Sequence, residues 1–228
     1  MYKAGFDYSW QEASFALCDE QGNLLLEEYH VFPPRNASGL TAWMSGLLAG
    51  HQLALNDISE WSVGSGPGSF TGLRVAASLV MGLCFGREIR RRAVSTASAM
   101  ADSLKLPAGI RRVLVLFDGH RDELLGYGLD RTPAGFVPSG YHEVLSRGSL
   151  SALADFEVLI GLEKDAARIR EIAGGQAAEK LQTIPHIQAS FLITNCPDDF
   201  SRKLTDPVYL RPAVFVEPRI PRQIAVPQ

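Results

Sequence analysis

The sequence is poor in the residues that build covalent or metal-linked frameworks. Its 228 residues include three cysteines, Cys18, Cys84 and Cys196, an odd number at wide spacing, which predicts neither a set of disulfides nor a zinc site. The five histidines contain no pair four residues apart and no His-Glu-x-x-His run, so neither a paired-histidine metal site nor a metalloprotease is indicated. We therefore expect no metal and no resident cofactor, and free thiols in a reducing compartment.

Long hydrophobic runs and an excess of one charge are also missing. The longest uncharged apolar stretch lies between Arg74 and Arg87, shorter than the roughly 20 residues of a membrane span, and no leader peptide is expected after Met1. Lys and Arg number 22 against 25 Asp and Glu, unlike a protein that covers nucleic-acid phosphates by itself. With 21 glycines and 13 prolines, the chain is not disordered or collagen-like. The composition predicts a globular, cytoplasmic protein with no membrane contact.

Apolar periodicity predicts an α/β protein made of two lobes that share a cleft, which the length permits. The N-terminal lobe is expected over 1–104, the C-terminal lobe over 105–217 and a loose tail over 218–228. The expected strands cover 3–7, 12–18, 23–31, 58–64, 113–117 and 156–161, and the expected helices 38–50, 70–85, 97–104, 163–173 and 190–195.

The two lobes open in the same way. A short strand ends on Asp7 or Asp118, and five residues later Glu12 or Glu123 begins another strand. The same offset relates both pairs of acids, which indicates an internal repeat. Asp7 and Asp118 facing each other across the cleft would be able to hold Mg²⁺ through water. Alternatively, each carboxylate only stabilises its own turn.

The segment 62–74, SVGSGPGSFTGLR, has the most unusual composition. Gly64, Gly66 and Gly68 lie between a predicted strand and a predicted helix, whose free N–H groups favour an anion, so one interpretation is a phosphate cradle. The other is a tight turn that packs closely against a neighbour. The segment has neither the lysine of a P-loop nor the spacing of a dinucleotide fingerprint, and Pro67 removes one N–H donor.

The helix after this turn, capped by Ser69 or Thr71, carries no charge from Val75 to Phe85. A helix that is apolar on all sides must be buried in a core or between subunits. The arginines that follow would form a basic patch for tRNA, or only a solvated face. They are Arg87, Arg90, Arg91 and Arg92, with Arg111 and Arg112 as additional candidates.

This turn and its helix resemble the signature of the TsaB (YeaZ) family, accessory subunits in the synthesis of N6-threonylcarbamoyladenosine (t6A) in tRNA. Similarity extends to Asp7, 95–101, 118–123 and the Val-Tyr-Leu-Arg run at 208–211, whereas 35–38, 87–92 and 119–121 depart from the family pattern. The residues of the signature turn are Gly66, Pro67, Gly68, Ser69, Phe70, Thr71, Gly72, Leu73 and Arg74.

The resemblance implies a duplicated, two-lobed fold of the actin/Hsp70/sugar-kinase type and a role as a non-catalytic subunit. The chain would pair with a TsaD-like catalytic subunit, complete the docking surface for a TsaE-like ATPase, and reach tRNA through the complex. ATP and Mg²⁺ would be bound mainly by those partners, and the chain alone would form a homodimer.

The helices at 38–50 and 70–86 would supply the partner surface. The alternative function is an ATP-hydrolysing enzyme of the same fold, with Asp7, Asp118 and the glycine-rich turn around Mg-ATP. The residues expected in the partner interface are Leu40, Trp43, Met44, Leu47, Leu73, Val80, Met81 and Leu83.

Overall fold

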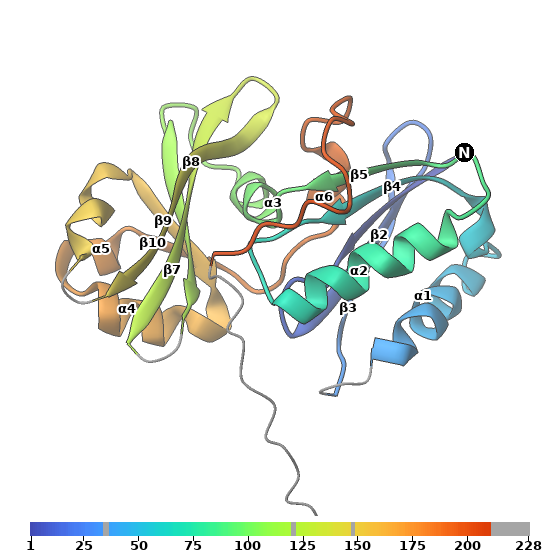
Figure 1. The fold of residues 1–228 in the computed structure, drawn as a ribbon. Coiled ribbons are helices and arrows are strands. Elements are labelled where there is room, and N and C mark those ends of the chain that lie inside the picture. The colour runs from blue at the N-terminus through green and yellow to red at the C-terminus, as the bar shows by residue number, and fades with distance from the viewer. Residues whose placement is uncertain (34–36, 120–121, 147–148, 211–228) are drawn as a thin grey trace, which may run out of the picture.

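The computed structural model describes residues 1–33, 37–119, 122–146 and 149–210, arranged as two β-sheets with helices around and between them (Figure 1). The tail expected over 218–228 and the end of the expected C-terminal lobe lie outside the described residues. So do Arg35, Asn36, His120, Arg121 and Arg211, which belong to the motifs and departures named above.

The first sheet has the strand order β3-β2-β1-β4-β5. The neighbouring strands β1, β2 and β3 pair antiparallel, while β4 runs parallel to β1 and β5 runs parallel to β4. The turn between β2 and β3 is held by the Asp19 carboxylate, which accepts hydrogen bonds from the backbone and side chain of Asn23. The strands are β1 (Tyr2–Asp7), β2 (Glu12–Cys18), β3 (Leu24–Val31), β4 (Ile58–Gly64) and β5 (Arg90–Val94).

The second sheet repeats this arrangement strand for strand, in the order β8-β7-β6-β9-β10. Here β6, β7 and β8 pair antiparallel, β9 is parallel to β6, and β10 is parallel to β9. Asp7 and Asp118 end the corresponding strands β1 and β6, so the internal repeat is confirmed. The strands are β6 (Arg112–Asp118), β7 (Glu123–Thr132), β8 (Gly135–Ser146), β9 (Val158–Leu162) and β10 (Leu181–Ile184).

Helices cover both sheets, and two of them are exchanged between the lobes. On the first sheet, α1 (Leu40–Ala49) and α2 (Phe70–Leu83) bury their apolar side chains in one core. On the second, α4 (Ala166–Ala173) packs beside α5 (Gly175–Glu179). Short 3-10 helices cover Ala37–Gly39, Leu55–Asp57, Leu150–Asp155 and Glu163–Asp165.

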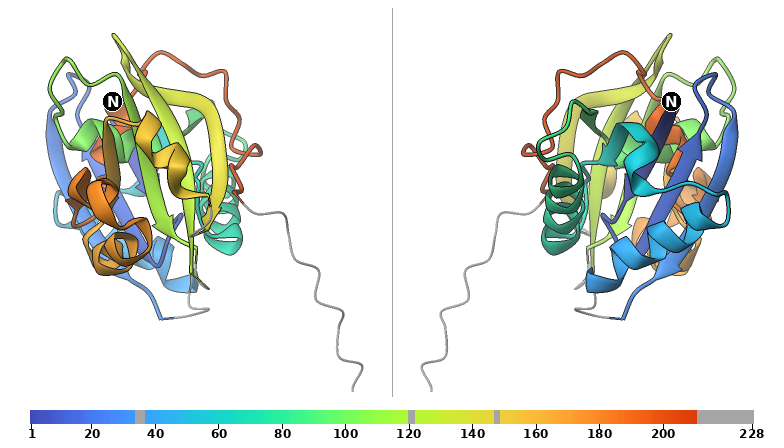
Figure 2. Two further views of the ribbon diagram at one scale, coloured as in Figure 1. Left: turned by 90° about the vertical axis from the view of Figure 1, so that its left-hand side faces the viewer. Right: turned by 90° about the vertical axis from the view of Figure 1, so that its right-hand side faces the viewer.

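The exchanged helices are α3 (Thr96–Ser103) and α6 (Ser190–Thr194), which lie between the sheets (Figures 1 and 2). Helix α3 follows the first sheet but packs on the second, where Ala97 and Met100 join the core. Helix α6 follows the second sheet and packs on β1, β2 and β4 of the first. A Cβ on Gly5 of β1 would lie 2.1 Å from the Ala189 carbonyl oxygen. The division at residue 104 therefore separates the sheets but not the packed lobes.

Several elements differ from the sequence-based expectation, which included no strand at β8 or β10 and no helix at α5. Helix α2 ends at Leu83 rather than at Phe85, and the arginine-rich segment after it forms the edge strand β5. Within the described ranges, no helix combines the length and hydrophobicity needed to cross a bilayer.

Candidate functional site

The signature turn, Gly66–Arg74, connects β4 to α2 and packs against the turn between β1 and β2. A Cβ on Gly68 would lie 2.4 Å from the Ser9 carbonyl oxygen, and a Cβ on Gly72 would lie 2.0 Å from that of Tyr8. Real Cβ atoms do not approach so closely, so only glycine allows the two backbone segments to touch. This is the close-packed turn that was one of the two interpretations of the sequence.

Two N–H donors of the turn, and that of the preceding Ser65, are matched by distant parts of the chain. The Ser65 N–H donates to the Val94 carbonyl at 2.8 Å, and the Gly66 N–H donates to Thr96 Oγ1 at 3.2 Å. The Ser69 N–H donates to a carbonyl of the β1–β2 turn at 2.6 Å. Since a phosphate cradle needs N–H groups that point to a ligand, these contacts favour the structural interpretation.

Asp7 lies inside this arrangement instead of facing a cleft. Its side chain is fully buried; Oδ1 accepts from the Ser9 N–H (2.8 Å) and hydroxyl (2.6 Å), and Oδ2 accepts from Thr96 Oγ1 (2.6 Å). Burial raises the pKa of Asp7, and these hydrogen bonds counteract it in part. A Cβ on Gly64 would overlap this carboxylate, at 1.8 Å from Oδ2. The expectation that Asp7 and Asp118 face each other as a Mg²⁺ pair is therefore wrong for Asp7.

The space between the ends of β1 and β6 is filled by an aromatic pair that sequence reasoning missed. Trp10, in the β1–β2 turn, stacks on Phe117 with ring centroids 4.7 Å apart and planes 14° from parallel. Phe117 directly precedes Asp118, and Trp10 packs against the core of the second sheet. The buried position of Asp7 argues against a nucleotide site that uses this carboxylate, which was one part of the alternative function.

The C-terminal Val-Tyr-Leu run meets the signature turn, although more than 130 residues separate them. The Val208 N–H donates to the Ser65 carbonyl at 2.7 Å. The Tyr209 ring lies 4.9 Å from that of Phe70, and its hydroxyl accepts from Arg74 Nε at 3.2 Å. The Arg74 guanidinium covers the Phe70 ring at 3.7 Å. Two motifs quoted for the family resemblance are thus parts of one contact.

The expected partner interface is only partly on the surface. Its members Leu40, Met44, Leu73 and Val80 are at most 1% exposed, and Leu40, Met44 and Val80 belong to the core between the helices and the first sheet. They were wrongly assigned to the interface, because apolar spacing marks a buried helix face as well as a docking face. Of the others, Trp43, Leu47 and Leu83 are partly buried, and Met81 is 42% exposed.

Helix α2 also presents apolar residues that the sequence analysis did not assign to the interface. Phe70 is 41% exposed and Phe85, just beyond the helix, is 88% exposed. Phe70, Arg74 and Met81 are spaced by four and seven residues, which places them on one stripe of the helix, and Phe85 follows the end of the helix. We call these four residues the α2 stripe. Ser69 caps this helix by accepting from the N–H of Gly72 at 3.3 Å.

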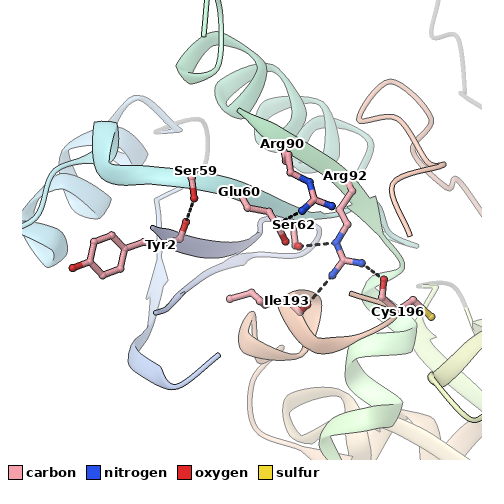
Figure 3. A network of polar contacts seen from close by, with 8 residues as sticks. All are labelled: Tyr2, Ser59, Glu60, Ser62, Arg90, Arg92, Ile193 and Cys196. Atoms are coloured by element: carbon pink, nitrogen blue, oxygen red, sulfur yellow. Dashed lines mark hydrogen bonds and ion pairs between the residues drawn. The ribbon is translucent and has the colours of Figure 1, made fainter. Parts of the chain in front are cut away.

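Arg92, expected in a basic patch for tRNA, is a buried structural residue (Figure 3). Its Nε donates to Ser62 Oγ on β4 at 2.9 Å. Its two Nη atoms donate to backbone carbonyls at the end of α6, where a cation is favourable. Those carbonyls belong to Leu192 (2.9 Å), Ile193 (2.8 Å), Asn195 (2.9 Å) and Cys196.

The other arginines of the expected patch do not gather around Arg92. Arg90 pairs with Glu60 at 3.4 Å (Figure 3), and Arg87 donates to Asn56. Arg111 and Arg112 lie at the start of β6, in the other sheet. The predicted basic patch is therefore wrong. Among the described residues, no three His, Cys, Asp or Glu side chains are placed to hold a metal ion.

Comparisons with known proteins agree with the quoted motifs. Residues 35–132 match the family model for TsaD, tRNA N6-adenosine threonylcarbamoyltransferase. The tRNA threonylcarbamoyladenosine biosynthesis protein TsaB of Escherichia coli is 30% identical over 96 residues, and that of Haemophilus influenzae 35% over 78 residues. Over these segments the chain is similar to the TsaB (YeaZ) proteins. The matched segments span 42% and 33% of those two relatives, and 42% and 34% of this chain.

The structural similarity to YeaZ covers more of the chain. A Pseudomonas aeruginosa protein described as similar to the peptidase YeaZ superposes with a TM-score of 0.72 at 25% identity. The superposition covers 92% of this chain and 99% of the other. Together with the duplicated sheets, it confirms the expected two-lobed fold of the actin/Hsp70/sugar-kinase type.

Proposed function

We propose that this chain is a non-catalytic accessory subunit in t6A synthesis, which pairs with a TsaD-type catalytic protein. The names of the E. coli and H. influenzae relatives support the pathway, and the matching family model names the transferase reaction. The observation that carries the pairing is the α2 stripe, an apolar surface left outside the core beside the signature turn.

The stripe has the properties of a docking surface. Helix α2 covers its own sheet with Leu73, Ala76 and Val80, so Met81 and Phe85 contribute nothing to that core. Burying one such side chain against a partner stabilises a complex by roughly 1.5–3 kcal/mol. Arg74 is the one charged residue of α2. Its guanidinium stacks on the Phe70 ring, and the other side chains of the helix carry no charge.

Helix α1 completes the surface with small side chains. Its exposed positions are Thr41, Ala42, Ser45, Gly46 and Ala49, and small residues allow a partner helix to approach closely. In the complex, the chain would hold the catalytic subunit in a competent state and complete the docking surface for a TsaE-like ATPase. ATP and Mg²⁺ would be bound mainly by those subunits, and tRNA would be reached through the complex. Alone, the chain would form a homodimer through the same stripe.

Paired purification with the TsaD-type protein of the same genome tests this function. The wild-type chain is expected to form a stoichiometric complex by size-exclusion chromatography with light scattering. Met81→Glu and Phe85→Glu should each weaken the complex about 30-fold or more, because each buries a charge in an apolar contact. Both variants should unfold at the wild-type temperature. The matched control is Val144→Glu, since Val144 is also exposed (38%) but lies on β8 of the other sheet.

The possible outcomes test the accessory role and the assignment of the α2 stripe separately. Absence of a wild-type complex would overturn the accessory role. A complex that tolerates Met81→Glu and Phe85→Glu as well as it tolerates Val144→Glu would overturn the assignment of the stripe. Reconstituted t6A synthesis should require this chain together with its partners, while the chain alone should form no t6A.

A further inference from the structure

A pocket of about 170 Å³ lies where β5, α3, β8 and the segment after α6 meet. Its lining includes no residue of the α2 stripe, and the proposed function does not use it. Both lobes contribute, since Arg92 comes from the first sheet and Pro138 from the second. The volume admits several water molecules or one small metabolite.

The buried end of the pocket holds a hydroxyl with no partner. Ser98 lines the pocket, its side chain is 1% exposed, and its Oγ has no hydrogen-bond partner. A buried polar group left unpaired is costly, so a ligand atom that bonds this hydroxyl would be stabilised. Ser98 lies in the first turn of α3, and the cap residue Ser95, which accepts from its N–H at 3.2 Å, lines the same pocket. The N–H groups of Thr96 and Ser98 already donate to Gly66 and Ser95, so the start of α3 contributes the positive end of its dipole, which favours negative charge, rather than free donors.

Charged side chains around the pocket add to this preference. The lining of the pocket includes two positive side chains, Arg92 and Arg202, and one negative side chain, Asp199. The N–H groups of Arg92 are used by Ser62 and by carbonyls, so Arg92 contributes only its charge. The exposed Arg202 hydrogen-bonds the Tyr127 side chain, and its other N–H groups can contact a ligand. One oxygen of Asp199 already accepts from the Ser201 N–H at 2.9 Å.

We propose that this pocket binds a small anion bearing a carboxylate or a phosphate group. The Arg202 guanidinium lies on the exposed side of the anionic group, and the Ser98 hydroxyl and the α3 N-terminus lie on its buried side. Because the walls come from both lobes, the bound anion stabilises their packing against each other.

Binding is tested by thermal unfolding and isothermal titration with inorganic phosphate, with succinate and with uncharged glycerol, all at one ionic strength. We expect saturable binding of at least one anion and a higher unfolding temperature. If only phosphate or only succinate binds, the result identifies whether the pocket recognises a phosphate or a carboxylate group. Arg202→Gln should weaken binding about 10-fold and Ser98→Ala about 5-fold. The unfolding temperature of each free variant is measured alongside, because Arg202 also hydrogen-bonds Tyr127, and the affinities are compared below it. The matched controls are Lys203→Gln and Ser45→Ala, which alter exposed residues outside the pocket.

Three results would overturn the proposal. They are no saturable binding of either anion up to tens of millimolar, an equal response to glycerol, and an equal loss of affinity in Arg202→Gln and Lys203→Gln. The last result would indicate a diffuse surface effect. None of them bears on the pairing with a TsaD-type protein, which is measured separately.

Discussion

Replacing Arg92 by methionine tests the conclusion that this residue locks α6 to the edge of the first sheet. The guanidinium joins Ser62 on β4 to carbonyl oxygens at the end of α6, and α6 is a helix from the far end of the chain. Methionine fills a similar volume but donates no hydrogen bond. Arg92→Met therefore removes the donors and keeps most of the packing.

The magnitude follows from the groups left behind. Each carbonyl that stays buried without a donor costs about 1–3 kcal/mol, and Arg92 serves carbonyls of Leu192, Ile193 and Asn195. The carbonyl of the partly exposed Cys196 can turn to water instead. Against these losses, the variant no longer buries a charge, which returns several kcal/mol. We expect a net loss of about 3 kcal/mol, a large share of the ~5–15 kcal/mol that stabilises a domain.

Urea unfolding followed by circular dichroism measures this difference. The matched control is Arg91→Met, because Arg91 is exposed on the same strand, and its stability should stay within about 0.5 kcal/mol of wild type. If Arg92→Met were as stable as Arg91→Met, the contact between Arg92 and α6 would not be a stabilising one and the reasoning would fail.

Two further predictions concern the packing around the buried Asp7 carboxylate. Gly64→Ala should destabilise the protein by about 2–3 kcal/mol in urea unfolding, because the new Cβ would displace the Asp7 carboxylate; Gly82→Ala, with no atom near its Cβ, should instead gain about 0.5–1 kcal/mol from helix propensity. Because burial raises the pKa of Asp7 above its ordinary 3.8, its contribution to stability is fully present below that value and is lost as the pH rises through the raised pKa. The unfolding free energy of Asp7→Asn minus that of wild type should therefore increase as the pH rises above about 4; a difference that is flat or falls with pH would contradict the raised pKa.

Local patterns predicted the repeated architecture but not every strand. The shared offset of Asp7 and Asp118 corresponds to strands in equivalent positions of two identically ordered sheets. The sequence analysis missed the edge strand β5 because a run of arginines is usually solvent-exposed and does not by itself indicate a strand. In the structure the three arginines have different environments, with Arg90 paired to an acid and Arg92 buried. Charged edge strands are common because they resist pairing with other chains.

The sequence could not distinguish the two apolar faces of α2. Leu73 and Val80 on one face, and Phe70 and Met81 on the other, both follow helical spacing. Which face is buried depends on the sheet that α2 covers, and that depends on contacts far along the chain. The orientation of the Asp7 side chain could not be predicted either, because one of its hydrogen-bond partners, Thr96, is 89 residues away in the sequence.

The glycine-rich composition of the signature turn suggests a phosphate site, although in the structure the turn packs closely against other parts of the chain. Phosphate loops and this turn both need glycine, because in each case another group approaches the backbone closely. In a phosphate loop the N–H groups remain available to the ligand. Here the N–H groups of Ser65, Gly66 and Ser69 are matched by β5, α3 and the β1–β2 turn, and the Ser65 carbonyl receives Val208. Residues 94–96, the β1–β2 turn and the C-terminal run thus meet at one turn. Composition predicts the glycines in both kinds of turn, but whether the N–H groups face a ligand or the protein depends on these distant segments.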